Sequence, residues 1–161
     1  MVENKGKVIH SRVGPLHVEQ DRLIFFPRGL VGFESQRDFA LVQVREHSSF
    51  FLLQSCTDPK LGLIVADPYV YVPDYRIKIS TAEEEVLGLK NIREAVVLVT
   101  VTIPAGHPED ATLNLVGPLV LNTRLRRGMQ VPQNQLRHPP RVLLSAERNQ
   151  REGAPERQDV R

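Results

Sequence analysis

Short apolar runs recur along the chain and are separated by Gly, Pro and Asp residues. The runs are rich in β-branched and aromatic residues, which is typical of strands bounded by turns. Most of the 12 prolines fall between the runs, where a missing backbone N–H costs no bond of a β-ladder. This spacing predicts a mostly β fold, a small antiparallel β-barrel-like domain. The predicted strands cover residues 8–13, 16–19, 23–26, 39–44, 50–54, 61–66, 69–72, 76–79, 95–103, 112–116, 119–121 and 129–131.

The longest run, residues 95–103, is continuously apolar at first and then alternates with Thr100 and Thr102. A strand with this pattern is covered on both faces over part of its length. We therefore expect it to lie at the centre of the barrel.

One segment predicts a short helix. Ser80 and Glu83 fit a capping box, in which the serine hydroxyl accepts from the Glu83 N–H and the Glu83 carboxylate reaches back. Gly88 fits a left-handed terminator, so the helix has about two turns. Thr81 is an alternative cap, one residue further on.

The 161 residues predict one domain, residues 1–139, followed by a charged, Arg-rich tail, residues 140–161, that we expect to be disordered. Residues 1–123 hold 12 Lys and Arg against 15 Asp and Glu, a net charge of −3. Residues 124–161 hold 9 Arg against 4 acidic residues, a net charge of +5. The basic character is therefore assigned to the tail, which weakens an interpretation of the main domain as a nucleic-acid binder.

The single cysteine, Cys56, excludes an intramolecular disulfide, and its apolar surroundings in sequence predict a buried structural thiol. The first ten residues lack the apolar core of a secretory signal, and no run of about 18 apolar residues could span a membrane. The expected location is the cytoplasm.

Catalytic and metal-binding patterns are missing from the sequence. Its five histidines, at positions 10, 17, 47, 107 and 138, show no metal-ligand spacing, and no nucleophile elbow or phosphate-binding loop occurs. We therefore expect neither an enzyme nor a bound metal, cofactor or small-molecule substrate.

Two local motifs predict turns. Gly29 and Gly32 form a Gly-x-x-Gly string whose apolar middle suits a tight turn better than an RNA backbone clamp. Asp67 precedes Pro68, a position where the carboxylate commonly caps the following turn.

All three tyrosines fall within seven residues, at positions 69, 71 and 75, beside Asp74. If residues 69–72 form a strand, Tyr69 and Tyr71 lie on one face. Tyrosine offers a large contact area at low entropic cost, so the cluster is a candidate recognition patch. The alternative is that these rings only cover one end of the barrel.

Several motifs occur together in a fixed order. Residues 26–34 read Phe-Pro-Arg-Gly-Leu-Val-Gly-Phe-Glu, residues 50–55 read Phe-Phe-Leu-Leu-Gln-Ser, and residues 112–122 read Thr-Leu-Asn-Leu-Val-Gly-Pro-Leu-Val-Leu-Asn. With Asp67-Pro68, Pro73-Asp-Tyr75, Gly128-Met-Gln130 and Arg137-His-Pro139, this series resembles the flagellar assembly factor FliW family over residues 8–139. The arginine cluster at residues 124–127 is denser than the resemblance leads us to expect.

The resemblance implies a compact antiparallel β-barrel-like fold and a protein-binding function. Members of this family bind CsrA, a small RNA-binding translational repressor, and antagonise its repression of flagellin synthesis. They also bind flagellin, so secretion of flagellin frees them to sequester CsrA. The expected partners are CsrA and flagellin, with no direct contact to nucleic acid or membrane.

Motif and chemistry select the candidate contact residues Phe33, Tyr69, Tyr71, Asp74, Tyr75, Asn114 and Asn122. For the two asparagines the alternative is satisfaction of turn backbones, and for Phe33 it is a place in the core. A second functional hypothesis is a β-barrel nucleic-acid-binding protein that uses the tail arginines and the tyrosines, with binding that weakens steeply with salt. A hydrolase or other enzyme is the third.

Overall fold

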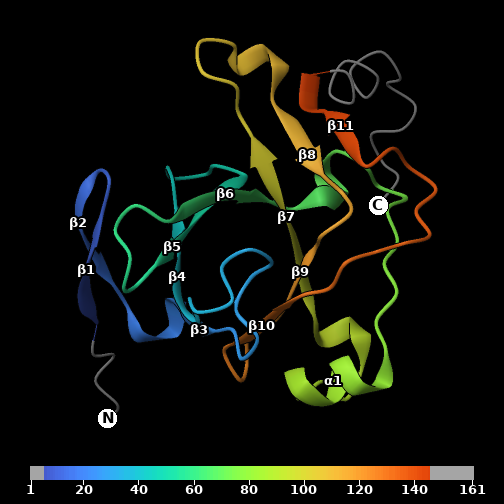
Figure 1. The fold of residues 1–161 in the computed structure, drawn as a ribbon, viewed down its shortest axis with the longest axis horizontal. Helices are drawn as coiled ribbons and strands as arrows, with labels where there is room; N and C mark the ends of the chain where they lie inside the picture. Colours follow the sequence, from blue (N-terminus) through green and yellow to red (C-terminus); the bar gives the residue numbers. More distant parts are fainter. Residues whose placement is uncertain (1–5, 146–161) are drawn as a thin grey trace.

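This computed structural model describes residues 6–145 of the chain (Figure 1). The named elements in this part are eleven strands, one α-helix and four short 3-10 helices, joined by turns and loops. The strands are β1 (Lys7–Ser11), β2 (Gly14–Val18), β3 (Leu23–Phe25), β4 (Asp38–Gln43), β5 (Phe50–Ser55), β6 (Gly62–Ala66), β7 (Val96–Thr102), β8 (Thr112–Asn114), β9 (Leu119–Asn122), β10 (Arg127–Gln130) and β11 (Arg141–Leu143). The helices are η1 (Gln20–Arg22), η2 (Pro68–Val70), α1 (Thr81–Leu87), η3 (Ile92–Glu94) and η4 (Pro108–Asp110).

Seven strands close into a barrel in the order β7-β6-β5-β4-β3-β10-β9, because β9 also pairs with β7. The predicted mostly β, barrel-like fold with one short helix is confirmed. The barrel pairings are antiparallel except between β3 and β10, which run parallel and share a single residue pair, Phe25 with Arg127. That junction is the least extensively paired seam of the barrel.

Strand β7 is covered on both faces in its middle, as its apolar pattern predicts, with Leu98 in one buried cluster and Val99 in another. It lies in the wall of the barrel and not at its centre, so that part of the prediction is wrong. Its first residues pair with β9, Val99 and Thr100 pair with β6, and Val101 and Thr102 pair with β8. Strands β8 and β11 continue the sheet beyond the barrel (Figure 1).

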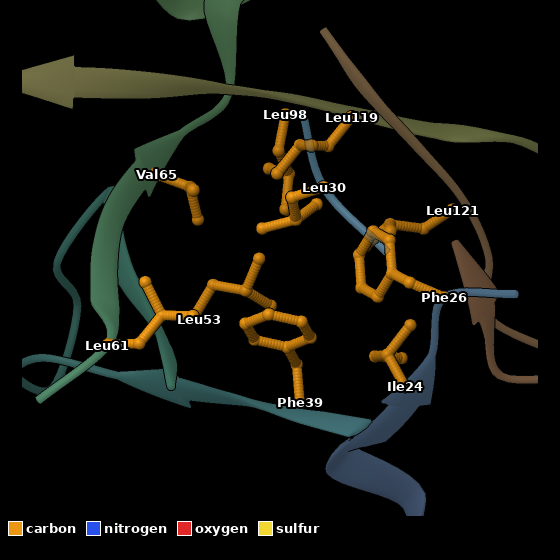
Figure 2. Close-up of a cluster of buried hydrophobic side chains, with 10 residues drawn as sticks. All are labelled: Ile24, Phe26, Leu30, Phe39, Leu53, Leu61, Val65, Leu98, Leu119 and Leu121. Atoms are coloured by element: carbon orange, nitrogen blue, oxygen red, sulfur yellow. The ribbon is translucent and has the colours of Figure 1, made fainter. Parts of the chain in front are cut away.

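Ten buried apolar side chains fill the barrel (Figure 2). Phe26 and Phe39 meet edge to face with their ring centroids 5.4 Å apart, a favourable geometry for aromatic pairs. Leu30, from the loop between β3 and β4, inserts into the same cluster. A separate hairpin, β1 with β2, packs Ile9 and Val18 against Ala40 of the barrel wall, which includes β4.

Helix α1 has the ends that the sequence predicts. The Glu83 N–H donates to the Ser80 hydroxyl at 3.1 Å, and the Ser80 N–H donates to the Glu83 carboxylate at 2.8 Å. Gly88 ends the helix in the left-handed region, with φ of 69°. Leu87 is buried against Val120 and Met129, which anchors the helix to the barrel. In the described part of the chain, no helix is both long and apolar enough to cross a membrane.

Two predicted strands are wrong. Residues 69–72 begin in the 3-10 helix η2, and residues 76–79 form no strand. The first prediction fails because the Asp67 carboxylate accepts from the Tyr69 N–H at 2.9 Å and turns the chain immediately.

The end of the domain lies beyond the predicted boundary at residue 139. Strand β11 pairs Arg141 with Asn114, Val142 with Leu113 and Leu143 with Thr112. Val142 is buried in the cluster beneath β8, so these residues belong to the sheet rather than to a tail. The predicted disorder of residues 146–161 concerns a segment outside the described residues.

The basic residues also lie in the domain rather than in the tail. Residues 6–145 carry 16 Lys and Arg against 14 Asp and Glu, whereas residues 146–161 carry 4 of each. Three of the arginines, at positions 124, 126 and 127, stand in and beside the turn between β9 and β10. The prediction that the folded part is mildly acidic and the tail basic is therefore wrong.

Candidate protein-binding surface

The segment from Asp67 to Tyr75 brings three of the predicted contact residues together. The rings of Tyr69 and Tyr75 lie 5.8 Å apart, and Asp74 lies beside His138 of the C-terminal segment. His138 Nε2 stands 3.3 Å from Asp74 Oδ1, within ion-pair distance but without hydrogen-bond alignment. This grouping arises because η2 turns the chain between Tyr69 and Tyr75.

Tyr75 is a core residue. Only 2% of it is exposed, and its hydroxyl donates to the Leu115 carbonyl oxygen at 2.7 Å. Burial raises the pKa of the phenol above its ordinary value, and the charge of Tyr69 when ionised adds to the shift. A side chain in this position supports the surface from below and cannot itself meet a partner.

Tyr71 is half-buried and points into a different environment from Tyr69. Its ring stacks on Phe50 with centroids 6.4 Å apart, and its hydroxyl shares a 3.1 Å hydrogen bond with Ser49. Because the backbone is helical here, Tyr69 and Tyr71 do not share the face that a strand would give them. Tyr71 therefore fixes the connection to β5.

Two side chains of this segment remain accessible. Tyr69 is exposed at its edge, and burial of the rest, together with the nearby Asp67 charge, raises the pKa of its hydroxyl. The Asp74 carboxylate is exposed as well. Together they offer an aromatic face beside a negative charge, which is the part of the predicted tyrosine patch that a partner could reach.

Phe33 is exposed, contrary to the alternative of a core role. It lies in the loop between β3 and β4, where 45% of it and 67% of Val31 face solvent. Leu30, between these exposed residues and β3, is buried in the barrel. The loop thus anchors one apolar side chain inside the barrel and presents two outside.

Several backbone bonds hold this loop in one conformation. The Phe33 N–H donates to the Leu30 oxygen at 2.8 Å, and the Val31 N–H donates to Gln130 Oε1 at 2.9 Å. Gly29 and Gly32 have φ of 64° and 86°, so the prediction of a tight glycine turn is confirmed. A preorganised apolar tip loses little conformational entropy on binding.

Val31 is the residue that sequence reasoning missed. Leu30 and Val31 both lie between the two turn glycines, yet Leu30 is buried and Val31 is exposed. The sequence pattern alone therefore does not indicate which of these two apolar side chains faces solvent.

The two asparagines have structural roles. Asn122 is buried, and its amide donates to the Leu87 and Gly88 carbonyls at 2.9 and 3.3 Å, closing the C-terminal end of α1. Asn114 accepts from the Val116 N–H at 3.2 Å. Both satisfy turn backbones, which is the alternative that the sequence leaves open.

His107, Glu109 and Asp110 bring possible ligand atoms within 4.8 Å of one another on the turn that contains η4. All three side chains are exposed, so water competes with them for a cation. This grouping supports no metal site.

Comparisons with known proteins identify the family. The family model described as "FliW protein" matches residues 7–144. A flagellar assembly factor FliW of Nitratidesulfovibrio vulgaris strain DP4 is 51% identical over 136 residues, which cover 84% of this chain and 79% of that protein. The corresponding protein of Desulfovibrio desulfuricans is 48% identical over 135 residues, covering 83% of this chain and 81% of its own.

A solved structure has the same fold. The crystal structure of a flagellar assembly factor FliW superposes with a TM-score of 0.78 at 27% sequence identity, covering 86% of this chain and 96% of that one. The family match includes both the loop that presents Phe33 and the β11 strand. This chain belongs to the FliW family of flagellar assembly factors.

Proposed function

We propose that this protein works by binding other proteins in the cytoplasm and not by catalysis. In this proposal it binds the translational regulator CsrA, antagonises CsrA repression of flagellin translation, and binds flagellin in exchange. Membership of the FliW family supports the proposal. The nucleic-acid alternative relied on the tail arginines, but residues 146–161 carry as many acidic as basic residues.

The observation that carries the proposal is the exposure of Val31 and Phe33 on a loop that the fold holds rigid. Exposed apolar side chains contribute little to folding, and nothing in the core requires them at this tip. Such side chains contribute most when a partner buries them, as the anchors of protein interfaces commonly do. Tyr69 and Asp74 supply a second accessible segment.

Exchange between the two partners requires only that each lowers the affinity for the other. By thermodynamic linkage, flagellin must weaken CsrA binding by the same factor by which CsrA weakens flagellin binding. A CsrA complex that stays intact in an excess of flagellin would contradict the exchange.

The contact role of the loop is tested with the double variant Val31→Ser/Phe33→Ser. We expect its affinity for CsrA or for flagellin to fall by at least about tenfold, because removing a buried anchor commonly costs 1–2 kcal/mol or more. The free energy of unfolding should change little, since both side chains are exposed. Val13→Ser, another exposed valine, in the β1–β2 turn, is the matched control and should bind normally. Unchanged affinity of the double variant for both partners would remove the loop from the interface.

A further inference from the structure

A groove with a volume of about 350 Å³ lies over the seam between β3 and β10. The two strands share only the Phe25–Arg127 pair there, reinforced by a 2.9 Å bond from the Phe25 N–H to the Arg126 oxygen. Neither the loop with Phe33 nor the segment with Tyr69 lines this groove. It is therefore distinct from the surface proposed above.

Apolar side chains line part of the groove. Phe25 on β3 is 42% exposed, and Leu125 in the β9–β10 turn is 40% exposed. Two large apolar residues from segments 100 positions apart line the groove here without being buried. They offer a place for one apolar side chain of a partner.

The charged side chains of the lining are mainly cationic, with Lys7, Arg126 and Arg127 against a single carboxylate, Asp38. The Arg127 guanidinium also donates to the Val86 oxygen at 3.3 Å, which leaves its other donors for a ligand. Arg126 has a φ of 56°, the left-handed region that glycine or asparagine usually occupies. The Arg126 guanidinium is fixed across the seam by a 2.7 Å bond from Nη1 to the Gln20 oxygen, which uses one of its five donors. Arginine thus stands where turn geometry favours glycine, and its charge is held at the groove.

We propose that this groove binds an acidic peptide segment of a partner protein. Carboxylates of the segment would accept hydrogen bonds from Arg126 and Arg127, with Lys7 adding charge, while an apolar side chain packs on Phe25 and Leu125. Charge-assisted hydrogen bonds from guanidinium groups are stronger than hydrogen bonds between neutral groups. This site is independent of the partners named above, and either proposal can fail without the other.

A peptide fits these features better than a nucleic acid does. Single-stranded nucleic acids need a basic groove that follows several phosphates. Here Asp38 interrupts the cations, and the space accommodates a few side chains rather than a run of nucleotides.

The test uses the full chain and a fluorescent synthetic peptide, acetyl-Glu-Asp-Leu-Phe-Asp-Glu-amide, in a polarisation titration. We expect saturable binding of this peptide. A control peptide with Asn in place of Asp and Gln in place of Glu should not bind. Arg126→Gly should weaken binding by about tenfold or more, as loss of a charged hydrogen bond does. The free energy of unfolding should stay unchanged or rise, because glycine adopts this φ without strain. Asp38→Asn should tighten binding.

Arg124→Ala is the matched control. Arg124 stands in the same turn and carries the same charge, but its nearest acidic partner is Glu94 at 3.8 Å and it does not line the groove. Its variant should bind the peptide within about twofold of wild type at moderate salt, where interactions between exposed charges that are not in contact are largely screened. Equal losses for Arg124→Ala and Arg126→Gly would show attraction to general positive charge and overturn the site.

Cys56 provides a second measurement at the groove. It is the only cysteine of the sequence and it lines the groove. The sequence predicts a buried thiol, whereas the structure has Cys56 half-buried. Bound peptide should slow its alkylation by iodoacetamide, and Arg126→Gly should remove this protection. Peptide binding without protection would place the peptide elsewhere. Protection by a single-stranded RNA oligonucleotide but not by the peptide would replace the peptide with a nucleic acid.

Discussion

The hydroxyl of Tyr75 donates a 2.7 Å hydrogen bond to the carbonyl oxygen of Leu115, 40 residues further along the chain. Both residues are buried, so this bond ties the segment after β6 to the chain between β8 and β9 in the interior. It also explains why the third tyrosine of an apparent surface cluster is a structural residue. Tyr69 and Tyr71 lie nearer the surface.

Tyr75→Phe should lower the free energy of unfolding by about 1–2 kcal/mol, because it leaves the buried Leu115 carbonyl without its donor. Urea denaturation followed by circular dichroism measures this change. Tyr69→Phe, at an exposed site of the same segment, should leave stability within about 0.5 kcal/mol of wild type. Similar effects of the two variants would contradict the assignment of Tyr75 to the core.

The raised pKa of Tyr75 predicts a loss of stability in alkali. Below about pH 10 the phenol is protonated in both states, but above it the unfolded chain releases the proton and the folded chain retains it. The unfolded state then binds fewer protons, so the free energy of unfolding falls as pH rises. The stability advantage of wild type over Tyr75→Phe should therefore shrink between pH 9 and pH 11, and an advantage that grows over this range would refute the shift.

Asn122→Ala should destabilise the fold by about 2–3 kcal/mol. The substitution leaves the Leu87 and Gly88 carbonyls without the amide that satisfies them, and a cavity forms behind α1. Thermal unfolding measures the loss. Asn114→Ala, which removes one bond at a half-buried site, should cost about 1 kcal/mol or less, and the reverse order of the two variants would contradict these roles.

Shortening the chain tests where the domain ends. A chain that ends at residue 145 keeps β11 and should unfold as the full chain does. A chain that ends at residue 139 loses the pairing of β11 with β8, the burial of Val142 and the 2.9 Å bond from the Leu115 N–H to the Pro140 oxygen. It should be less stable by several kcal/mol, since one fully buried valine alone contributes about 1.5–3 kcal/mol. Equal melting temperatures of the two shortened chains would contradict the assignment.

Local chemistry explains which elements the sequence predicts well. The capping box of Ser80 and Glu83 and the terminator Gly88 act within one helix, so they can be read without tertiary information. The cover of β7 on both faces can be predicted from its apolar pattern, because a continuous apolar run is typical of a strand buried on both sides. The barrel is predicted by the resemblance to the FliW family. No local pattern specifies its closure between β7 and β9.

The wrong predictions have two causes: local turn formation that competes with strand propensity, and contacts between residues far apart in the sequence. Tyr69 and Val70 favour a strand by composition, but the Asp67 cap, three residues or fewer away, forms a turn first. Strand β11 has only three residues in a charged context, and the apolar residues at 142–144 were its only signal. The burial of Tyr75 depends on Leu115, which no sequence spacing connects to it.

The candidate contacts divide in the same manner. Phe33, Tyr69 and Asp74 are accessible, whereas Tyr75 and Asn122 are buried and Tyr71 and Asn114 are half-buried. Motifs and residue chemistry select all seven residues, because a sequence pattern does not separate a residue that binds from one that supports the binding loop. Exposure in the fold makes this separation.

The most direct test of the proposed function is a calorimetric titration of the purified protein into CsrA, repeated with a short CsrA-target RNA present. We expect saturable binding, and we expect the protein to lower the affinity of CsrA for that RNA. If no heat of binding is seen and the affinity of CsrA for RNA is unchanged, CsrA antagonism is contradicted. If flagellin still binds in that case, the protein is a flagellin-binding protein only. Absence of binding to both CsrA and flagellin would contradict the proposed function as a whole.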